Sequence, residues 1–278
     1  MIRYTPLLDL TEFCFGRFDH PGEEHHHDPK LEVTSEYSVS RVEKGKFSLE
    51  IEGGLWELGP GHYFLNCAGM EYRCRHFELV PTDVCFSVSI NYLASANSPE
   101  QTDRFERAAR KKPVHSPSNR LAYLFLQLAK SREEPMRAEE AVHEVIAEIL
   151  RYSDHAREPY RDRQLSWYAE RVDAARQQMD RCYAQEQRLA LLARSVGMSE
   201  FHFARIFREL VGVPPHAYLR RRRLSEAARR LRDRVSVTDA CFASGFQNLS
   251  HFTRQFCREF GINPSVYARQ DKHRAGDL

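Results

Sequence analysis

Short apolar runs alternate with turn signals along the first 95 or so residues. The runs are separated by EKGK, EGG and GPG, and they occupy residues 35–42, 47–51, 55–58, 62–66 and 83–90. Apolar residues recurring at every second position, broken by glycine turns at short intervals, are typical of antiparallel strands. The pattern therefore predicts an antiparallel sandwich or a small barrel.

From Ser98 to about Tyr160 the apolar period becomes that of a helix. A broad apolar stripe runs along residues 138–152 and comprises Ala141, Val145, Ile149 and Tyr152, widened by Val142, Ile146 and Leu150. A stripe of this width has to be buried against other helices, and a partner subunit is one candidate surface. The polar, proline-containing stretch that follows, residues 158–166, predicts an interdomain linker.

The remainder of the chain contains an internal repeat. FARIFRELVGVPPHAY, residues 203–218, recurs 49 positions later as FTRQFCREFGINPSVY, residues 252–267, with Phe, Arg, Phe, Gly, Pro and Tyr in the same register. A short helical segment ending in glycine precedes each copy, at Gly197 and at Gly245. A helix, a glycine turn and a second helix form the helix-turn-helix pattern, which is therefore predicted twice.

Local signals set the expected helix boundaries. Ser199 and Asn248 are suited to cap the second helix of each unit, and Ser236 with Asp239 predicts a capping box for the helix that starts there. Gly197 and Gly245 can take the positive φ that a tight turn requires.

A helical projection separates a core face from an exposed face in each second helix. The predicted core residues are Phe203, Ile206, Phe207 and Leu210 in the first and Leu249, Phe252, Phe256 and Phe260 in the second. The candidate DNA-binding residues are Ser199, Glu200, Phe201, Ala204, Arg205, Arg208, Asn248, Ser250, His251, Thr253, Arg254 and Arg258. Arginines on such a face can bond guanine edges or phosphates, and an exposed phenylalanine can contact a thymine methyl group.

A single helix should join the two units. Residues 216–231 place Leu219, Leu224, Ala227 and Leu231 inward, and about 16 residues at 1.5 Å each give a spacer of roughly 24 Å. We expect the consecutive Arg220, Arg221, Arg222 and Arg223 to contact phosphates, which would make affinity strongly salt-dependent.

Charge is distributed unevenly along the chain. Residues 161–278 hold 22 Lys and Arg against 13 Asp and Glu, a net +9, whereas the first 160 residues hold 19 against 26, a net −7. This asymmetry favours a module that binds a polyanion joined to one that does not. Without a basic leader or a long apolar run, the sequence predicts a soluble, cytoplasmic protein.

The repeat and its flanks resemble the AraC/XylS family of bacterial regulators. The resemblance rests on GMSEFHFARIFRELVGVPPHAYL and ASGFQNLSHFTRQFCREFGINPSVYAR and covers roughly residues 168–270. One departure is Cys241, where the family usually carries alanine; a small buried thiol should fit there with little strain. The resemblance implies a cupin-like N-terminal part that binds an effector, and LGPGHYFLN, residues 58–66, resembles part of the second cupin motif.

Two other functions remain open at this level. A thiol or metal sensor is suggested by Cys74 and His76, which lie two apart on a predicted strand and so share a face, with Cys67 and Cys85 on strands expected to be neighbours. The run of His25, His26, His27 and Asp28 is a second metal candidate, although such runs are usually hydrated loops. The sequence lacks the metal-binding histidines that a cupin-type enzyme is expected to have. It also contains no catalytic pair with suitable spacing.

The sequence therefore predicts an α+β protein of several parts. These are a cupin-like antiparallel β barrel over residues 1–97, a helical dimerisation segment over 98–157, a linker over 158–166 and an all-α domain with two helix-turn-helix units over 167–272. The expected function is effector-controlled, sequence-specific DNA binding without catalysis, cofactor or metal. The expected partners are double-stranded promoter DNA, a small-molecule effector, a second copy of the chain and RNA polymerase, with no membrane.

Overall fold

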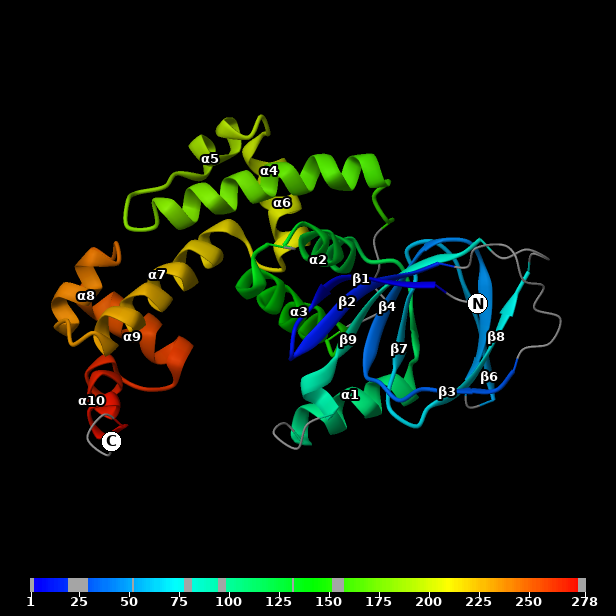
Figure 1. The fold of residues 1–278 in the computed structure, drawn as a ribbon. Helices are drawn as coiled ribbons and strands as arrows, with labels where there is room; N and C mark the ends of the chain where they lie inside the picture. The colour runs from blue at the N-terminus through cyan, green and yellow to red at the C-terminus, as the bar shows by residue number, and fades with distance from the viewer. Residues whose placement is uncertain are drawn as a thin grey trace. The chain divides into compact units, whose positions relative to one another are not determined.

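The chain consists of two compact units, residues 1–161 and 162–278 (Figure 1). The computed structural model describes residues 3–19, 30–51, 53–77, 82–94, 99–131, 133–151 and 158–274. The histidine run at residues 25–27 and the stripe residue Tyr152 lie outside the described residues.

Unit 1 begins with strands and continues with helices. Its strands are β1 (Arg3–Asp9), β2 (Phe13–Asp19), β3 (Glu32–Val33), β4 (Ser38–Lys44), β5 (Phe47–Ile51), β6 (Gly54–Leu58), β7 (Tyr63–Asn66), β8 (Glu71–His76), β9 (Val84–Ile90) and β10 (Val114–His115). Its helices are the short η1 (Asn91–Ala94), α1 (Pro99–Lys111), α2 (Asn119–Lys130) and α3 (Pro135–Ile149). The five strands predicted from the apolar alternation are all present.

The strands form two antiparallel sheets. One has the order β1-β2-β9-β4-β7-β10 and the other the order β3-β8-β5-β6. One face of the six-stranded sheet packs on α2, where Phe125 contacts Phe15 and Tyr63 with ring centroids 6.2 and 5.6 Å apart. The other face meets the four-stranded sheet, where Phe47 of β5 contacts Phe64 of β7 edge to face at 6.2 Å.

The face of the six-stranded sheet that meets the smaller sheet carries small polar side chains. Register pairs Phe64 with Ser40, Ser40 with Ser87 and Val42 with Cys85, and paired residues point to the same face. Ser40 and Ser87 are buried and their hydroxyl groups are 2.9 Å apart. Buried serines in place of branched apolar residues make this interior polar and reduce the side-chain volume that fills it.

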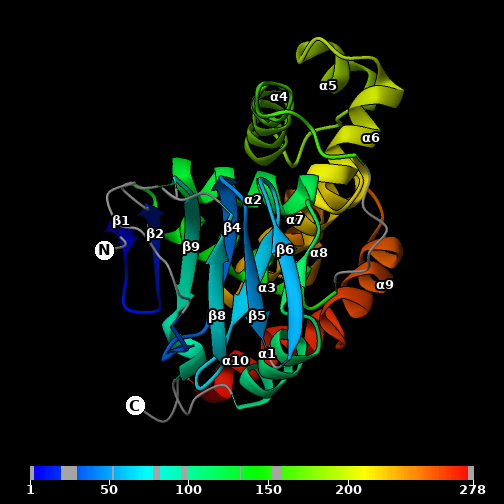
Figure 2. The ribbon, with the colours of Figure 1, turned by 90° about the vertical axis from the view of Figure 1, so that its right-hand side faces the viewer.

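Helices α2 and α3 pack on one another behind the sheets (Figure 2). Most of the stripe predicted on α3 is buried within the chain itself: Leu150 is half-buried, and the buried residues are Ala141, Val142, Val145, Ile146 and Ile149. Arg120 of α2 reinforces the pair by bonding Glu144 and Glu148 at 3.1 and 2.9 Å. The expected burial against other helices is therefore met within the chain itself, so these residues need no partner subunit as their cover, and the dimerisation segment stays a prediction.

The thiols of unit 1 are more dispersed than the sequence suggested. Cys74 and His76 share a face of β8 as predicted, with Sγ and Nε2 3.6 Å apart. Cys67, however, follows the end of β7, and β4 lies between β7 and β9, so Cys67 and Cys85 are not on neighbouring strands. The prediction failed because adjacency in a sheet depends on long-range pairing that sequence spacing does not encode.

Unit 2 is entirely helical in its described part. Its helices are α4 (Asp162–Arg181), α5 (Leu189–Ser195), α6 (Glu200–Val211), α7 (Pro215–Arg232), α8 (Val237–Ala243), α9 (Leu249–Phe260) and α10 (Pro264–Arg274). Helix α4 starts at Asp162, so the last five residues of the expected linker form its first turns. Helix α7 carries Leu219, Leu224, Ala227 and Leu231 on its buried side, as predicted for the joining helix. No helix among the described residues is long and apolar enough to cross a membrane.

Candidate nucleic-acid interface

Helix α6 follows α5 and is bounded by two capping residues. Ser199 accepts a hydrogen bond from the His202 N–H and thereby satisfies one of the free donors at the start of the helix. Gly212 ends it in the left-handed conformation, with φ 81°. Its predicted core residues, Phe203, Ile206, Phe207 and Leu210, are all buried. We refer to α5 and α6 as the first module.

Helix α9 follows α8 and repeats this design; α8 and α9 form the second module. Asn248 accepts from the His251 N–H, Gly261 ends the helix with φ 76°, and Phe252 and Phe256 are buried. The core prediction was wrong for Leu249, whose side chain is 38% exposed. Leu249 is the first residue of the helix, and a helical side chain points back toward the N-terminus, here beyond the core cluster.

The turns within the modules take the backbone conformation that their glycines allow. Gly197 has φ 68° and Gly245 has φ 86°. Ser236 caps α8 by accepting from the Asp239 N–H at 3.1 Å, and its hydroxyl also donates to the Asp239 carboxylate at 2.6 Å. Cys241 is fully buried in the core cluster of the second module, as expected for a residue that replaces alanine.

The outward face of α6 combines an aromatic ring with two arginines. Phe201 is 82% exposed, and Arg205 and Arg208 are exposed one and two turns further on. Arg205 lies 3.7 Å from the Glu209 carboxylate of the same helix, a weak surface pair that a stronger anion can displace. Ser199 and Glu200 are also exposed, whereas Ala204 is half-buried. A large ring and two guanidinium groups on one helix turned to solvent have no role in the core.

The outward face of α9 is more polar. Asn248, Ser250, His251, Arg254 and Arg258 are exposed. Thr253 is half-buried, and its hydroxyl donates to the backbone carbonyl of Leu249 at 2.9 Å. Among the described residues no salt bridge involves Arg254 or Arg258, and both side chains are exposed.

The four consecutive arginines of α7 do not act alike. Arg223 donates to the backbone carbonyls of Tyr183 and Gln185 at 2.7 and 2.8 Å and so holds the connection between α4 and α5. Arg222 is near Asp180 and Glu226, each at 3.7 Å. Arg221 is exposed with Glu259 at 3.5 Å, and Arg220 is half-buried. A helix sends consecutive side chains in directions 100° apart, which is why the tetrad cannot share one surface.

Two polar networks in unit 2 were not predicted from the sequence. Glu226 is buried and is bonded by Arg229 at 2.6 Å and contacted by Arg230 at 3.2 Å. The hydrogen bond from Arg229 lowers the pKa of Glu226. A buried glutamate flanked by arginines at i+3 and i+4 is a sequence signal for such a cluster.

The second network joins α4 to α7. The Tyr218 hydroxyl donates to the Asp180 carboxylate at 2.9 Å and lies 3.4 Å from Arg176 Nε, which donates to it. Burial raises the pKa of Tyr218 to about 12, so its proton stays in place to make the bond. Tyr218 is a repeat position, but its equivalent Tyr267 packs on Phe256 and Phe260 instead.

Known proteins are similar to the part of the chain that contains these helices. A family model described as "Helix-turn-helix domain" matches residues 192–270, which include α6 to α9. The transcriptional activator AarP of Providencia stuartii is 37% identical over 81 residues, 29% of this chain and 60% of AarP. The regulator YbfI of Bacillus subtilis is 23% identical over 272 residues, 90% of this chain and 88% of YbfI. Residues 192–270 thus match a helix-turn-helix domain, and over this part the chain resembles the AraC/XylS family.

A solved structure is also similar to this part of the chain. A probable AraC-family regulator from Rhodopseudomonas palustris is 27% identical, with a TM-score of 0.35, and the match covers 37% of this chain and 97% of that one. The chain matches only part of the length of the relatives with the higher identities. It spans about 60% of AarP and 32% of Yersinia VirF.

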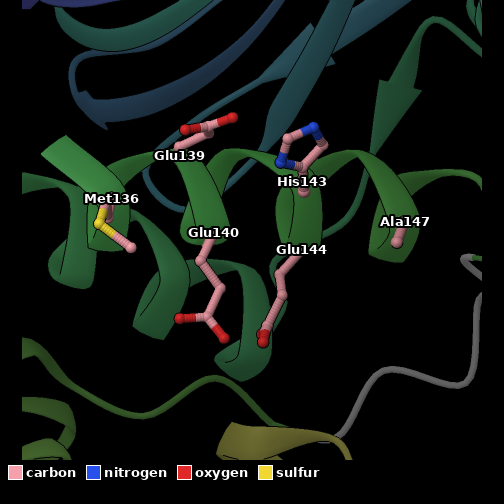
Figure 3. A pocket seen from close by; sticks show the side chains of 6 residues that line it. All are labelled: Met136, Glu139, Glu140, His143, Glu144 and Ala147. Carbon is pink, nitrogen blue, oxygen red and sulfur yellow. The ribbon is translucent and has the colours of Figure 1, made fainter. Parts of the chain in front are cut away.

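Unit 1 offers less specific features. Within the described ranges, no three His, Cys, Asp or Glu side chains are grouped so as to hold a metal ion. A shallow pocket lies along the outward face of α3, lined by Met136, Glu139, Glu140, His143, Glu144 and Ala147 (Figure 3). Its three carboxylates would repel DNA phosphates, so this face is not a nucleic-acid site.

Proposed function

We propose that this chain is a sequence-specific transcription regulator that binds promoter DNA with α6 and α9 in the major groove. The observation that carries the proposal is the duplication: two helices of equal length, with equivalent caps and equivalent buried phenylalanines, each expose arginines on the face opposite the core. The second helix of a helix-turn-helix unit is the one that contacts base edges. Two such helices in one chain imply two contacts with one duplex.

The length of α7 supports this arrangement. Its 18 residues correspond to about 27 Å at 1.5 Å per residue, close to the roughly 34 Å that separates successive major-groove faces. In Figure 2, α6 and α9 lie along the same side of unit 2. The Tyr218–Asp180 bond holds α7 against α4, and the ion pairs of Glu226 with Arg229 and Arg230 link side chains along α7 itself.

The proposed residue roles follow from exposure. Arg205 and Arg208 of α6 and Arg254 and Arg258 of α9 bond guanine edges or phosphates, and Phe201 contacts a thymine methyl group. Polar contacts come from the other polar side chains that are exposed or half-exposed, Ser199, Glu200, Asn248, Ser250, His251 and Thr253, and Ala204 supplies an apolar contact. Arg220 and Arg221 supply phosphate contacts, while Arg222 and Arg223 hold the fold of unit 2.

Unit 1 is proposed to bind a small-molecule effector between its two sheets. The support is the interior described above, where buried Ser40 and Ser87 face the smaller sheet. Ser38 continues this polar lining and accepts from the Asn66 side-chain amide at 3.2 Å. Ligand sites are usually clefts with a few placed polar groups among apolar walls, and the effector would act by binding one state of the regulator more tightly than another. The closed, cupin-like form of this unit is part of the proposal.

The proposed partners of the whole regulator are a second copy of the chain and RNA polymerase, in the cytoplasm. For the dimer, the buried stripe of α3 is not available, so the outward face of α3 is the better candidate. Met136, on that face, is 85% exposed and would be covered in such a dimer.

The test uses duplexes selected from a random pool by the full chain. Arg205→Ala and Arg254→Ala should each weaken binding to a selected duplex by about 1 to 3 kcal/mol while leaving binding to random DNA nearly unchanged, because a bidentate contact to guanine discriminates between bases. Arg107→Ala, which removes the same charge from the exposed surface of α1 in unit 1, is the matched control and should leave both affinities unaltered. Equal losses on selected and random duplexes would instead assign both arginines to the phosphate backbone.

A further inference from the structure

Three side chains of unit 1 form a relay at the end of β8 and the start of β9. Cys74 Sγ lies 3.6 Å from His76 Nε2, and His76 Nδ1 lies 3.2 Å from Asp83 Oδ1. The side chains of His76 and Asp83 are 7% and 6% exposed. A thiol, an imidazole and a carboxylate thus stand in sequence, each within hydrogen-bonding distance of the next.

The carboxylate lies on the Nδ1 side of the imidazole and the thiol on the Nε2 side. In the tautomer in which Nδ1 donates to Asp83, Nε2 carries the lone pair that faces Cys74 Sγ. A nucleophile beside a base that is oriented by a third group is the recurring geometry of activated serine and cysteine residues, and it is recognised by these roles rather than by sequence order. Asp83 was not singled out in the sequence because nothing in the spacing shows that β8 and β9 bring it to His76.

The position of the relay indicates what it can meet. Cys74 pairs with Leu49 and His76 with Phe47 on β5, so both face the space between the sheets, and Phe47 contacts the His76 ring at 6.0 Å. Burial raises the pKa of Cys74, with Asp83 adding to the effect, which keeps the resting thiol protonated. Apolar walls and nearby carboxylates favour a neutral reagent over an anion.

We propose that Cys74 is a covalent capture site for neutral α,β-unsaturated carbonyl compounds, with His76 as its general base and Asp83 as the residue that positions His76. The inference rests on the proposed function in one respect, namely that the captured molecule is an effector of the regulator.

The addition needs no oxidant or metal. As Cys74 Sγ bonds to the β-carbon of the unsaturated carbonyl, its proton passes to His76 Nε2 and the π electrons of the carbon–carbon double bond move toward the α-carbon to give an enolate. The imidazolium then returns the proton to the α-carbon. A thioether results, the imidazole is neutral again and Asp83 stays ionised throughout. A base that accepts the proton during the attack removes the need for a free thiolate in the resting site.

The test begins with the unmodified full chain, treated with methyl vinyl ketone in the presence of EDTA. Peptide mass spectrometry after short intervals gives the rate of adduct formation at each of the seven cysteines. Cys74 should react faster than the half-exposed Cys14, whose thiol is bonded to Tyr4 and not to a histidine. A Cys74 rate equal to or below that of Cys14 would overturn the proposal, and this comparison needs no variant.

Variants then separate a general base from a merely structural histidine. His76→Gln should lower the Cys74 rate by about 100-fold, and Asp83→Asn should lower it by less, while the Cys14 rate in the same molecules stays constant and reports an intact fold. An unchanged Cys74 rate in folded His76→Gln would contradict the proposal.

DNA binding separates this inference from the proposed function. The affinity of the chain for a selected duplex should change once Cys74 is modified, and it should not change in Cys74→Ser treated in the same way. If Cys74 is modified without any change in affinity, the effector role fails while DNA binding stands. If the untreated chain selects no duplex, the proposed function fails whatever the labelling shows.

Discussion

Gly245→Ala should lower the free energy of unfolding of unit 2 by about 3 kcal/mol. Gly245 has φ 86°, which costs an L-residue roughly 1 to 2 kcal/mol. A Cβ atom there would also lie 2.6 Å from the backbone oxygen of Ala184, and relieving such an overlap costs roughly 1 to 3 kcal/mol. Because the obstructing atom belongs to the backbone, no side-chain rotation can clear it. Urea unfolding followed by far-ultraviolet circular dichroism measures the change.

The matched control is Gly197→Ala, in the equivalent turn of the first module. Gly197 has φ 68°, but a Cβ atom there would meet nothing within 4 Å, so we expect a loss of only about 1 kcal/mol from the backbone conformation. The difference between the two variants isolates the contact with Ala184, which belongs to the connection that Arg223 also holds. Equal losses of unfolding free energy in the two variants would show that a Cβ atom at position 245 does not clash with the backbone of Ala184.

Phe256→Ala should be the most damaging single change in the second module, at about 3 to 5 kcal/mol, because it empties a large volume in a packed core. Phe256 is fully buried, and its ring lies 5.5 Å from Phe252, 4.4 Å from Phe260 and 5.4 Å from Tyr267. Removing the ring takes away the contact of Phe256 with Tyr267 between α9 and α10. Binding to the selected duplex should fall as well, since α9 would no longer be held in place.

Phe242→Ala is the control for aromatic truncation. Phe242 lies on α8 of the same module but is 52% exposed, so the loss should stay within about 0.5 kcal/mol. A loss at Phe242 as large as that at Phe256 would mean that burial does not determine the stability of this module.

Much of unit 2 could be predicted because its structure is local. The caps Ser199 and Asn248 and the turn glycines depend only on residues a few positions away, and the buried phenylalanines follow from helical period. The predicted burial of Leu249 was wrong because this residue lies at a helix end. The helical period of apolar residues does not show whether the core extends that far.

The features that escaped prediction depend on long-range pairing. The order of the strands separates Cys67 from Cys85 and brings Asp83 to His76, and neither result follows from spacing along the chain. In the same way, the arginines of α7 looked equivalent in sequence, but Tyr183 and Asp180 of the preceding segment give Arg223 and Arg222 internal partners. Side-chain roles that depend on a second element need coordinates.

The central claim is that α6 and α9 contact successive major grooves on one side of a duplex. Guanine methylation interference on a selected duplex tests it most directly, because methylation at N7 blocks contacts in the major groove. We predict two groups of interfering guanines about one helical turn apart on the same face, with Arg205→Ala weakening one group and Arg254→Ala the other. A single group, or two groups on opposite faces of the duplex, would contradict the account.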